Sequence, residues 1–274
     1  MIVKLARYPV KSMLGEDLHL ARLTVTGMIG DRRWAVTDSE SGRIASAKHP
    51  RKWSRLLYLA ARACPNGDAV TIAFPDGQVM AGDESGINEK LSTYLGWPVH
   101  LSSTPPSGGA IERVDPIVRG TFVDESERHV SESMVGGLER STFVDYGPLH
   151  LLTLSTLNHL RQLVPCSAVD VARFRPNLVI DLEGTQPFAE NDWKGKRLSL
   201  GTQAVLELDE PTPRCAIPAL AQPGIPDDPD VIRIIARHNR VILPGTGPVA
   251  CLGVYARVLE SGLVKVGDPV ELHG

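Results

Sequence analysis

The clearest structural signal in this chain is the segment Ala69-Val70-Thr71-Ile72-Ala73-Phe74-Pro75-Asp76-Gly77-Gln78-Val79-Met80-Ala81. Two short runs rich in β-favouring residues flank its centre, Pro75-Asp76-Gly77. Asp-Gly supplies the positive φ angles that a tight hairpin needs. The segment therefore predicts a β-hairpin with strands over residues 69–74 and 78–81.

The same pattern of short strands bounded by turns extends on both sides of this hairpin. It predicts further strands over residues 2–8, 18–24, 34–37, 43–45 and 56–63. One short helix is expected over residues 87–95, where apolar side chains form a single stripe and Gly96 follows. Residues 104–109 have the composition of a linker, and the polar stretch that follows shows little periodicity as far as residue 141.

Strand signals resume in the second half of the chain. A strand over residues 149–153 leads into a helix, with Ser155 and Thr156 as N-cap candidates and Pro165 after its end. A second helix is expected over residues 229–240. Because short strands dominate and do not alternate regularly with helices, the pattern favours a β-rich (α+β) fold over a doubly wound sheet. The remaining strands are predicted over residues 177–181, 197–200, 204–208, 252–258 and 269–272.

Composition narrows the class of protein. At 274 residues the chain has room for one large domain or two modest ones. Its net charge of −3 gives no reason to expect nucleic acid or a membrane surface as partner. It contains no apolar run of about 20 residues, the length that spans a bilayer, and no signal peptide is recognisable at its start. A cytoplasmic protein is expected.

Several common kinds of site find no support in the sequence. No glycine-rich nucleotide loop is present, and the histidines show no spacing typical of zinc ligands. The 4 cysteines are too scattered for a disulfide framework. These patterns argue against a Rossmann enzyme, a P-loop enzyme and a zinc enzyme.

One cysteine stands in an unusual setting, Glu210-Pro211-Thr212-Pro213-Arg214-Cys215-Ala216-Ile217-Pro218. Its three prolines predict a rigid loop that is neither helix interior nor central strand. A cation such as Arg214 favours the thiolate form of a neighbouring cysteine, and the thiolate attacks electrophiles and binds soft metals. A small buried cysteine without chemical duty is the alternative for Cys215 on these residues alone.

Two motifs of the first half offer donors for an anion. Lys11 and Ser12 directly follow the first strand, and an ammonium beside a hydroxyl suits a phosphate. In Gly30-Asp31-Arg32-Arg33-Trp34, Asp31 is placed to orient one arginine while the other reaches inward. A solvated turn and a surface ion pair are the respective alternatives.

Two motifs of the second half offer similar groups. Pro176 favours extended backbone for the residue before it, so Arg175 and Asn177 should leave the chain on the same face. Two convergent donors suit an anionic or heteroaromatic ligand. Ser155 and Thr156 at a helix start could bind an anion, or serve only as an ordinary cap.

Five motifs in order resemble the MOSC superfamily, which is named for the C-terminal domain of molybdenum-cofactor sulfurase. The likeness covers nearly the whole chain and is greatest to the mitochondrial amidoxime-reducing component and its bacterial relatives. It implies an N-terminal MOSC-type β-barrel domain over residues 1–115, followed over residues 116–274 by a MOSC β-barrel domain with a few flanking helices. The motifs are Tyr8-Pro9-Val10-Lys11-Ser12, Gly30-Asp31-Arg32-Arg33-Trp34, Phe174-Arg175-Pro176-Asn177, Arg214-Cys215 and Lys265-Val266-Gly267-Asp268-Pro269-Val270.

The resemblance also implies a ligand and a set of residues that hold it. The ligand is the molybdenum cofactor, Mo-molybdopterin, with the Cys215 thiolate as a metal ligand and Arg214 beside the metal as a second catalytic residue. Tyr255 matches a family position near the cofactor. The positions that match those holding the pterin and its phosphate are Lys11, Ser12, Arg32, Ser155, Thr156, Arg175 and Asn177.

The expected activity is reduction of N–O bonds in small N-hydroxylated compounds. The chain shows neither the membrane segment of the mitochondrial members nor the iron–sulfur domain of some bacterial ones, so a separate electron-donor protein is expected as partner. Substrate-facing loops are expected within residues 104–148, where the resemblance is weakest. Two alternatives stay open: a protein that binds or carries the cofactor, and a sulfur carrier with a persulfide on Cys215.

Overall fold

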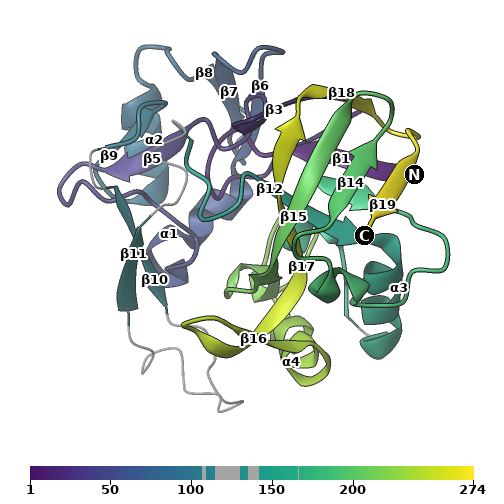
Figure 1. Ribbon diagram of the computed structural model, residues 1–274. Helices are drawn as coiled ribbons and strands as arrows, with labels where there is room; N and C mark the ends of the chain where they lie inside the picture. The colour runs from purple at the N-terminus through teal and green to yellow at the C-terminus, as the bar shows by residue number, and fades with distance from the viewer. Residues whose placement is uncertain (107–108, 115–129, 135–141, 166) are drawn as a thin grey trace.

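The structure is a computed structural model that describes residues 1–106, 109–114, 130–134, 142–165 and 167–274. Strands dominate it and helices flank them, which confirms the β-rich (α+β) fold (Figure 1). The domain boundary expected at residues 115–116 and part of the expected linker, residues 107–108, lie outside the described residues.

The first half of the chain forms short strands and two short helical regions. The expected hairpin is present as β7 and β8, with β6 on its other side, and the expected helix matches α2. The strands are β1 (Ile2–Arg7), β2 (Glu16–Leu18), β3 (Leu20–Thr24), β4 (Gly27–Met28), β5 (Ala35–Asp38), β6 (Ala60–Ala63), β7 (Val70–Ala73), β8 (Val79–Ala81), β9 (Val99–Ser102), β10 (Ala110–Val114) and β11 (Val130–Met134). The helices are α1 (Pro50–Trp53), the 3-10 helix η1 (Ser54–Tyr58) and α2 (Ile87–Leu95).

Two strand predictions in this half need correction: the one over residues 56–63 holds only for β6, and the one over residues 43–45 is wrong. Residues 56–58 belong to η1, because Leu56, Leu57 and Leu59 are all fully buried, a pattern that a strand with one exposed face cannot produce. In residues 43–45, Ile44 forms only isolated bridges to Thr37 and Ile111. The prediction failed there because a single buried apolar residue in a connecting segment resembles a short strand.

The second half supplies most of a barrel-like sheet and the helices that cover it. Its strands are β12 (Leu149–Thr153), β13 (Leu178–Ile180), β14 (Arg197–Leu200), β15 (Ala204–Pro213), β16 (Arg240–Leu243), β17 (Gly247–Glu260), β18 (Gly262–Lys265) and β19 (Val270–His273). Its helices are α3 (Leu154–Leu163), η4 (Val171–Arg173), η5 (Ala189–Asp192), η6 (Ile217–Ala219) and α4 (Pro229–His238). No helix in the described residues is long and apolar enough to cross a bilayer.

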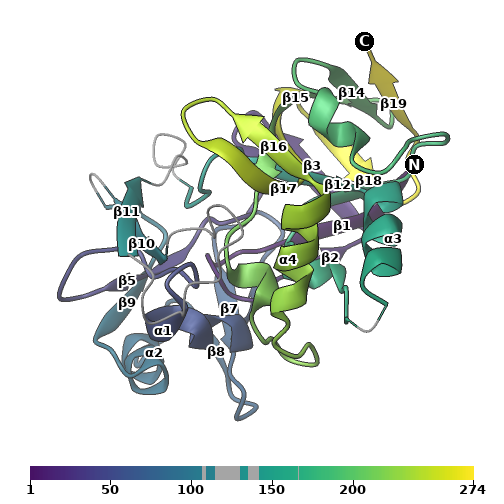
Figure 2. The same ribbon diagram turned by 90° about the horizontal axis from the view of Figure 1, so that it is seen from below.

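The main sheet has the strand order β19-β14-β15-β17-β12-β13-β1-β2, with β16 also paired to β17. Its end strands β19 and β2 do not pair with each other among the described residues, so the expected β-barrel is an open, barrel-like sheet. Two backbone bonds, from Ile2 N to Asp268 O and from Gly267 N to Ile2 O, link β1 to the turn before β19. Figure 2 shows α3 and α4 beside this sheet.

The hydrophobic cores do not coincide with the two halves of the sequence. Ile2 and Leu5 of β1 pack in the core of the main sheet with residues of the second half such as Val254. A separate core, built from residues 10–99, includes Val36 and Leu91. The chain therefore starts in the sheet of the second half and returns to it as β2, and Ala21, Leu23 and Met28 still pack in its core. Other residues of the first half build a separate lobe around the second core.

The proline-rich segment before Cys215 corrects another prediction. Pro211 and Pro213 lie in β15, which pairs with β14 and β17 inside the sheet, opposite Val254 and Cys251. The register shifts on both sides of Pro211, and such bulges accommodate residues that have no N–H to donate. The strand ends at Pro213, so Arg214 and Cys215 emerge at its end.

Gly253 lies where β17 carries its extra residue against β15, with a φ of +80°. A Cβ there would meet Leu151 O at 2.4 Å and His150 Nε2 at 2.5 Å. We expect Gly253→Ala to lower the free energy of unfolding by about 2–5 kcal/mol, because left-handed backbone costs an alanine about 1–2 kcal/mol and the overlap adds more. Urea unfolding measures the loss.

The matched control is Gly195→Ala, which has the same φ of +80° and no heavy atom within 4 Å of the new Cβ. It should lose only the backbone contribution of about 1–2 kcal/mol. Equal losses in the two variants would contradict the assigned overlap at Gly253.

Candidate functional site

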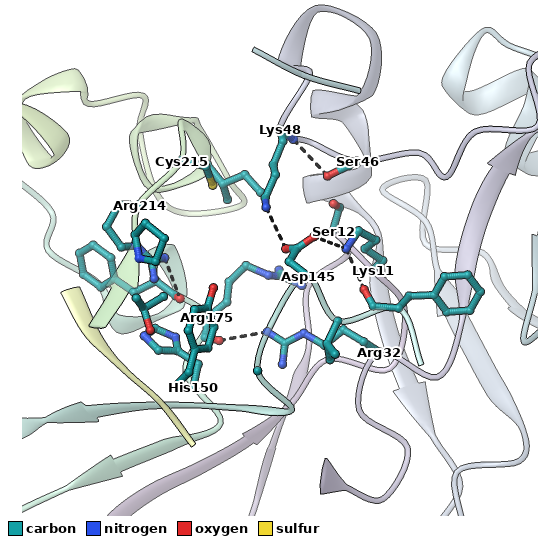
Figure 3. Close-up of a pocket in the computed structure, with 18 of the residues that line it drawn as sticks. Lys11, Ser12, Arg32, Ser46, Lys48, Asp145, His150, Arg175, Arg214 and Cys215 are labelled. Atoms are coloured by element: carbon teal, nitrogen blue, oxygen red, sulfur yellow. Dashed lines mark hydrogen bonds and ion pairs between the residues drawn. The ribbon is translucent and has the colours of Figure 1, made fainter. Parts of the chain in front are cut away.

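A cleft of about 110 Å³ lies between the lobe around the core of residues 10–99 and the lobe formed by the main sheet (Figure 3). Eight of the side chains expected at a site line it, and they come from segments far apart in the sequence. They are Lys11, Ser12, Arg32, Arg175, Asn177, Arg214, Cys215 and Tyr255. The charged groups of the described lining are the cations Lys11, Arg32, Lys48, Arg175 and Arg214, together with one carboxylate, Asp145. The cleft is strongly cationic.

Backbone strain is concentrated at this cleft. Ser12, Arg32 and Arg175 have φ angles of 65°, 44° and 55°, and Phe188 is the one other non-glycine residue with a positive φ in the described chain. Each such residue costs about 1–3 kcal/mol and persists only where the surroundings enforce it, typically at functional sites. Three of them in one lining indicate that the cleft has a function.

The conformation of Arg175 corrects the expectation of extended backbone before Pro176. A φ of 55° is left-handed. Two neighbours hold this turn: Arg32 Nη2 donates to Arg175 O at 3.2 Å, and Arg214 Nη2 donates to Phe174 O at 3.0 Å. Hydrogen bonds from distant arginines have thus overridden the local preference imposed by proline.

Asn177 positions other groups with its side chain. Its Oδ1 accepts from Arg32 Nη1 and from the His150 backbone N–H, both at 3.1 Å, and its Nδ2 donates to Ala6 O at 3.2 Å. The amide therefore joins β1, β12 and Arg32. Although Asn177 lines the cleft as expected, these contacts make it a positioning residue rather than a free ligand donor.

Asp31 orients the arginine that enters the cleft. Asp31 Oδ2 accepts from Arg32 Nη1 at 2.5 Å, while Oδ1 accepts from the Tyr8 backbone N–H at 2.8 Å. Burial works to lower the pKa of Arg32, but the Asp31 charge outweighs it and raises that pKa. Arg33, which we expected to share these roles, donates to Ser103 O instead.

Arg175 is a buried cation and Arg214 a half-buried one, and both have unused donors. Nη1 and Nη2 of Arg175 have no hydrogen-bond partner among the described residues, and neither does Nε of Arg214. Burial, followed by the charge of Arg32, lowers the pKa of Arg175 to about 10. Burial also lowers the pKa of Arg214, against the opposing effect of Cys215. The Arg175 guanidinium lies over the Tyr8 ring, with Cζ 4.3 Å from the ring centroid, but a ring face leaves its N–H donors unused. Because a buried cation without a hydrogen-bonded counter-charge costs several kcal/mol, this arrangement fits a bound anion.

Two lysines of the first lobe hold the single carboxylate of the cleft, as Figure 3 shows. Lys11 Nζ donates to Asp145 Oδ1 and to Phe143 O, each at 2.7 Å. Lys48 Nζ lies 3.0 Å from Asp145 Oδ2. Burial opposes ionisation of Asp145, but the charges of Lys11 and Lys48 hold its pKa well below the ordinary range.

The sequence did not identify Lys48, Asp145 or His150 as site residues. Lys48 stands between two predicted elements, and Asp145 follows the stretch without periodicity. His150 is buried at the cleft, and burial, then the charge of Arg214, lowers its pKa to about 3. Its Nε2 lies 3.1 Å from Leu252 O, which suits an N–H donor of the neutral ring. The sequence offered no local signal for any of the three.

Cys215 lies at the end of β15 and is partly exposed. Arg214 N donates to Ala250 O at 2.8 Å, which fixes the backbone before the thiol. The Tyr255 ring packs so closely against Gly147 that a Cβ there would lie 2.7 Å from Tyr255 Cβ. Burial raises the pKa of Tyr255 far above its usual value, so its hydroxyl keeps its proton.

Arg173 fixes the loop that follows Cys215. The side chain is fully buried, and its donors go to backbone carbonyls: Nε to Ala168 O at 2.7 Å, Nη1 to Pro218 O at 2.9 Å, and Nη2 to Pro226 O at 2.7 Å. Arg173 therefore connects the segment that carries Arg175 to the loop that starts at Cys215. We assign it the role of a positioning residue.

Ser155 and Thr156 do not lie at the cleft, which corrects their expected placement. The N-cap of α3 is Thr153, whose Oγ1 accepts from the Thr156 backbone N–H at 3.1 Å. The Thr156 hydroxyl is buried and donates to Glu190 Oε2 at 2.9 Å. Ser155 lines a separate surface hollow with Met1. The helix starts earlier than Ser155 and Thr156 suggested, so both residues lie within α3 and neither lines the cleft.

Within the described residues, no three His, Cys, Asp or Glu side chains gather into a group that could hold a metal ion. The other described cysteines are Cys64 and Cys251. Cys251 is buried, and burial raises its pKa to about 12. Cys166 lies outside the described residues.

Comparisons with known proteins match both halves of the chain. The family model of the MOSC N-terminal beta barrel domain matches residues 1–106, and that of the MOSC domain matches residues 139–271. Mitochondrial amidoxime-reducing component 1 of Xenopus laevis is 23% identical over 298 residues, which cover 98% of this chain and 81% of that protein. The Mus musculus protein of the same name is 22% identical over 300 residues, with 100% and 82% covered.

Among solved structures, the YUAD protein from Bacillus subtilis aligns with 100% of this chain and 94% of its own, at 13% identity and a TM-score of 0.48. YiiM from Geobacillus stearothermophilus aligns with 60% of this chain and 73% of its own, at 16% identity and a TM-score of 0.36.

The Arg173 contacts predict an effect on the Cys215 loop. Arg173→Met leaves the carbonyls of Pro218 and Pro226 without a donor, so we expect the free energy of unfolding to fall by about 2–4 kcal/mol. Alkylation of Cys215 by iodoacetamide, followed by peptide mass spectrometry, should become about tenfold faster as the loop opens locally. Arg161→Met, which removes a 3.3 Å bond to Val169 O and an exposed 3.0 Å bond to Asn158 Oδ1, should change neither quantity appreciably. An unchanged alkylation rate in Arg173→Met would contradict the positioning role.

The buried carboxyl of Glu190 predicts a pH-dependent stability. Its Oε1 has no partner among the described residues, and burial raises the pKa of Glu190 above 4.5. The folded state retains a proton that the unfolded state releases, so stability falls as pH rises from 4.5 through the raised pKa. Glu190→Gln should gain on the wild type by up to about 1.4 kcal/mol per pH unit in that window, measured by urea unfolding. Exposed Glu183→Gln should show no such trend. A gain from Glu190→Gln that is independent of pH would refute the assignment.

Proposed function

Because the chain is a MOSC protein with an N-terminal MOSC barrel domain, we propose that it is a molybdenum-cofactor oxidoreductase that reduces N–O bonds of N-hydroxylated compounds. The single observation that carries the proposal is the buried guanidinium of Arg175, whose terminal nitrogens have no hydrogen-bond partner among the described residues, in a cationic cleft that ends at Cys215. The names of two relatives of low identity, amidoxime-reducing components, support the type of reaction.

The donors of the cleft suit the molybdenum cofactor. Lys11, Arg32 and Arg175 supply positive charge for its phosphate, and the Ser12 hydroxyl, whose oxygen accepts from Ala47 N at 3.0 Å, still has a proton to donate. The Cys215 thiolate would be the protein's ligand to the metal, since thiolates bind such soft centres. When bound, the cofactor supplies the two-electron chemistry, while the protein orients it and adjusts its charge.

The reaction consumes two electrons and two protons. The N–O bond of the substrate breaks, its oxygen leaves as water, and an amine or amidine remains. We assign the electrons to a separate electron-donor protein. Beside the thiol, the chain contributes two groups. Arg214 is fixed by the hydrogen bond that it donates to Phe174 O, and Tyr255 keeps its hydroxyl proton because burial raises its pKa.

Two other functions remain as outcomes of the same experiments. A carrier of the cofactor would retain molybdenum without reducing any N-hydroxylated compound when given a competent reductant. A sulfur carrier would show an added sulfur on Cys215 by mass spectrometry. The unpaired donors of Arg175 and Arg214 favour a protein that holds an anionic ligand, because a persulfide on Cys215 needs no such group of cations.

Protein made in a host that synthesises the cofactor should contain close to stoichiometric molybdenum by elemental analysis. Cys215→Ala should lose most of its activity. Arg175→Met should lower the molybdenum and pterin content about tenfold, since a charge-assisted hydrogen bond to an anion contributes about 1.5–3 kcal/mol. The cofactor-free Arg175→Met protein should unfold at a higher urea concentration than the cofactor-free wild type, because it no longer buries an unpaired charge.

Arg33→Met is the matched control, since its guanidinium donates to Ser103 O and does not line the cleft. It should retain the wild-type molybdenum content. Metal-free wild-type protein from a competent host would sink the proposal, and so would an Arg175→Met protein that keeps its full content.

A further inference from the structure

Tyr8 is a buried aromatic residue next to two cations of the cleft. It follows β1, is 5% exposed and does not itself line the cleft. Its backbone is bonded twice to the motif that carries Arg32: the N–H donates to Asp31 Oδ1 at 2.8 Å, and the carbonyl accepts from Arg32 N at 2.8 Å. The ring is confined as well, because a Cβ on Gly15 would meet Tyr8 Cδ1 at 2.6 Å. These contacts fix the position of the Tyr8 ring.

Two guanidinium groups lie over this one ring. Arg175 Cζ is 4.3 Å from the ring centroid, and Arg32 Cζ is 4.6 Å from it. The face of an aromatic ring attracts cations, most strongly where water is excluded. Because burial raises the pKa of Tyr8 to about 12, the phenol stays neutral and the attraction comes from the ring rather than from a phenolate. One ring therefore attracts two like charges that repel each other.

The two arginines depend on the ring to different extents. Arg32 is also held by Asp31 Oδ2 and by Asn177 Oδ1. The terminal nitrogens of Arg175 have no hydrogen-bond partner among the described residues, so the ring is the contact that orients this guanidinium. A flexible arginine loses rotamer freedom when it binds an anion, and a contact that fixes it beforehand reduces that cost.

We propose that Tyr8 is a positioning residue of the anion site, and that its ring holds the guanidiniums of Arg32 and Arg175 where one anion can bind both. The inference rests on the anion-binding part of the proposed function. A phosphate group fits two adjacent guanidiniums, since its oxygens accept charge-assisted hydrogen bonds from both. If Tyr8 only filled space in the core, any ring of the same size would serve equally well.

Fluorination of the ring separates these two roles, because it weakens the attraction for cations and changes the size of the ring little. Position 8 of the cofactor-free protein is replaced by phenylalanine, 4-fluorophenylalanine or 3,4,5-trifluorophenylalanine, and calorimetric titration with inorganic phosphate measures the affinity. Tyr8→Phe should bind phosphate like the wild type. The affinity should then fall stepwise with fluorination, by about tenfold in the trifluorinated variant.

The same series in an Arg175→Met background shows whether the ring acts through Arg175. Only Arg32 then remains over the ring, and Asp31 and Asn177 hold it independently. Fluorination should therefore weaken the residual phosphate binding by about threefold or less, as expected when two coupled residues are changed together. An undiminished tenfold loss in this background would contradict the action through Arg175.

Tyr94 provides the matched control, since Arg55 Cζ lies 4.5 Å from its ring centroid and neither residue lines the cleft. The same three phenylalanines at position 94 should leave the phosphate affinity unchanged. Equal affinity of the phenylalanine and trifluorinated variants at position 8 would overturn the inference. Wild-type protein that binds no phosphate would overturn it too, because there would be no anion site for Tyr8 to organise.

Molybdenum content of the wild type from a cofactor-competent host separates this inference from the proposed function. Protein that contains molybdenum, but whose phosphate affinity is the same with and without fluorine at position 8, refutes the role of Tyr8 alone. Protein without molybdenum refutes the proposed function. A phosphate affinity that still falls with fluorination would then assign Tyr8 to the site of another anion.

Discussion

The antiparallel pairing of β1 with β13 is the constraint on which the rest of the molecule depends. It places the first strand of the chain in the sheet of the second half, with Leu5 opposite Leu178, before the chain first leaves this sheet and then returns to it as β2. The backbones of Ala6 and Asn177 are bonded at the point of departure. The residues that follow β1 and those that precede β13 therefore meet at one place, and the cleft is formed there.

Several cationic side chains lie close together in this cleft, so hydrogen bonds and ion pairs must fix their positions. Arg32 is held by Asp31 and Asn177, and Lys11 by Asp145. Among the arginines that the structure describes, Arg175 alone has both terminal nitrogens buried without a hydrogen-bond partner, and it stands on a left-handed backbone. Such an arrangement is unfavourable in isolation, so the surrounding hydrogen bonds must maintain it. Stability has been given up locally at this cleft, as is usual where strain accompanies function, and this supports the proposed anion site.

Short-range signals in the sequence were sufficient for many of the strands, for α2 and for eight residues of the cleft. Lys11, Arg175 and Cys215 belong to compact motifs whose chemistry could be recognised from the sequence alone. Lys48 and Asp145 could not be identified from the sequence. Each has its role only through its ion pair with the other, and the two residues lie far apart in the chain. The left-handed turn at Arg175 was missed for a related reason: bonds from Arg32 and Arg214 decide it, and local propensity does not.

The setting of Cys215 shows what a sequence motif leaves undetermined. The prolines around it suggested a loop apart from the sheet, yet Pro211 and Pro213 pair within β15, and the thiol projects from the end of a fixed strand. On one side it faces a cleft dominated by cations, and on the other a cavity with tyrosine rings and a carboxylate. A nucleophile would need only one of these spaces. The proposed role of Cys215 as a ligand to a cofactor would use both, because the cofactor would be held on one side and would meet its substrate on the other.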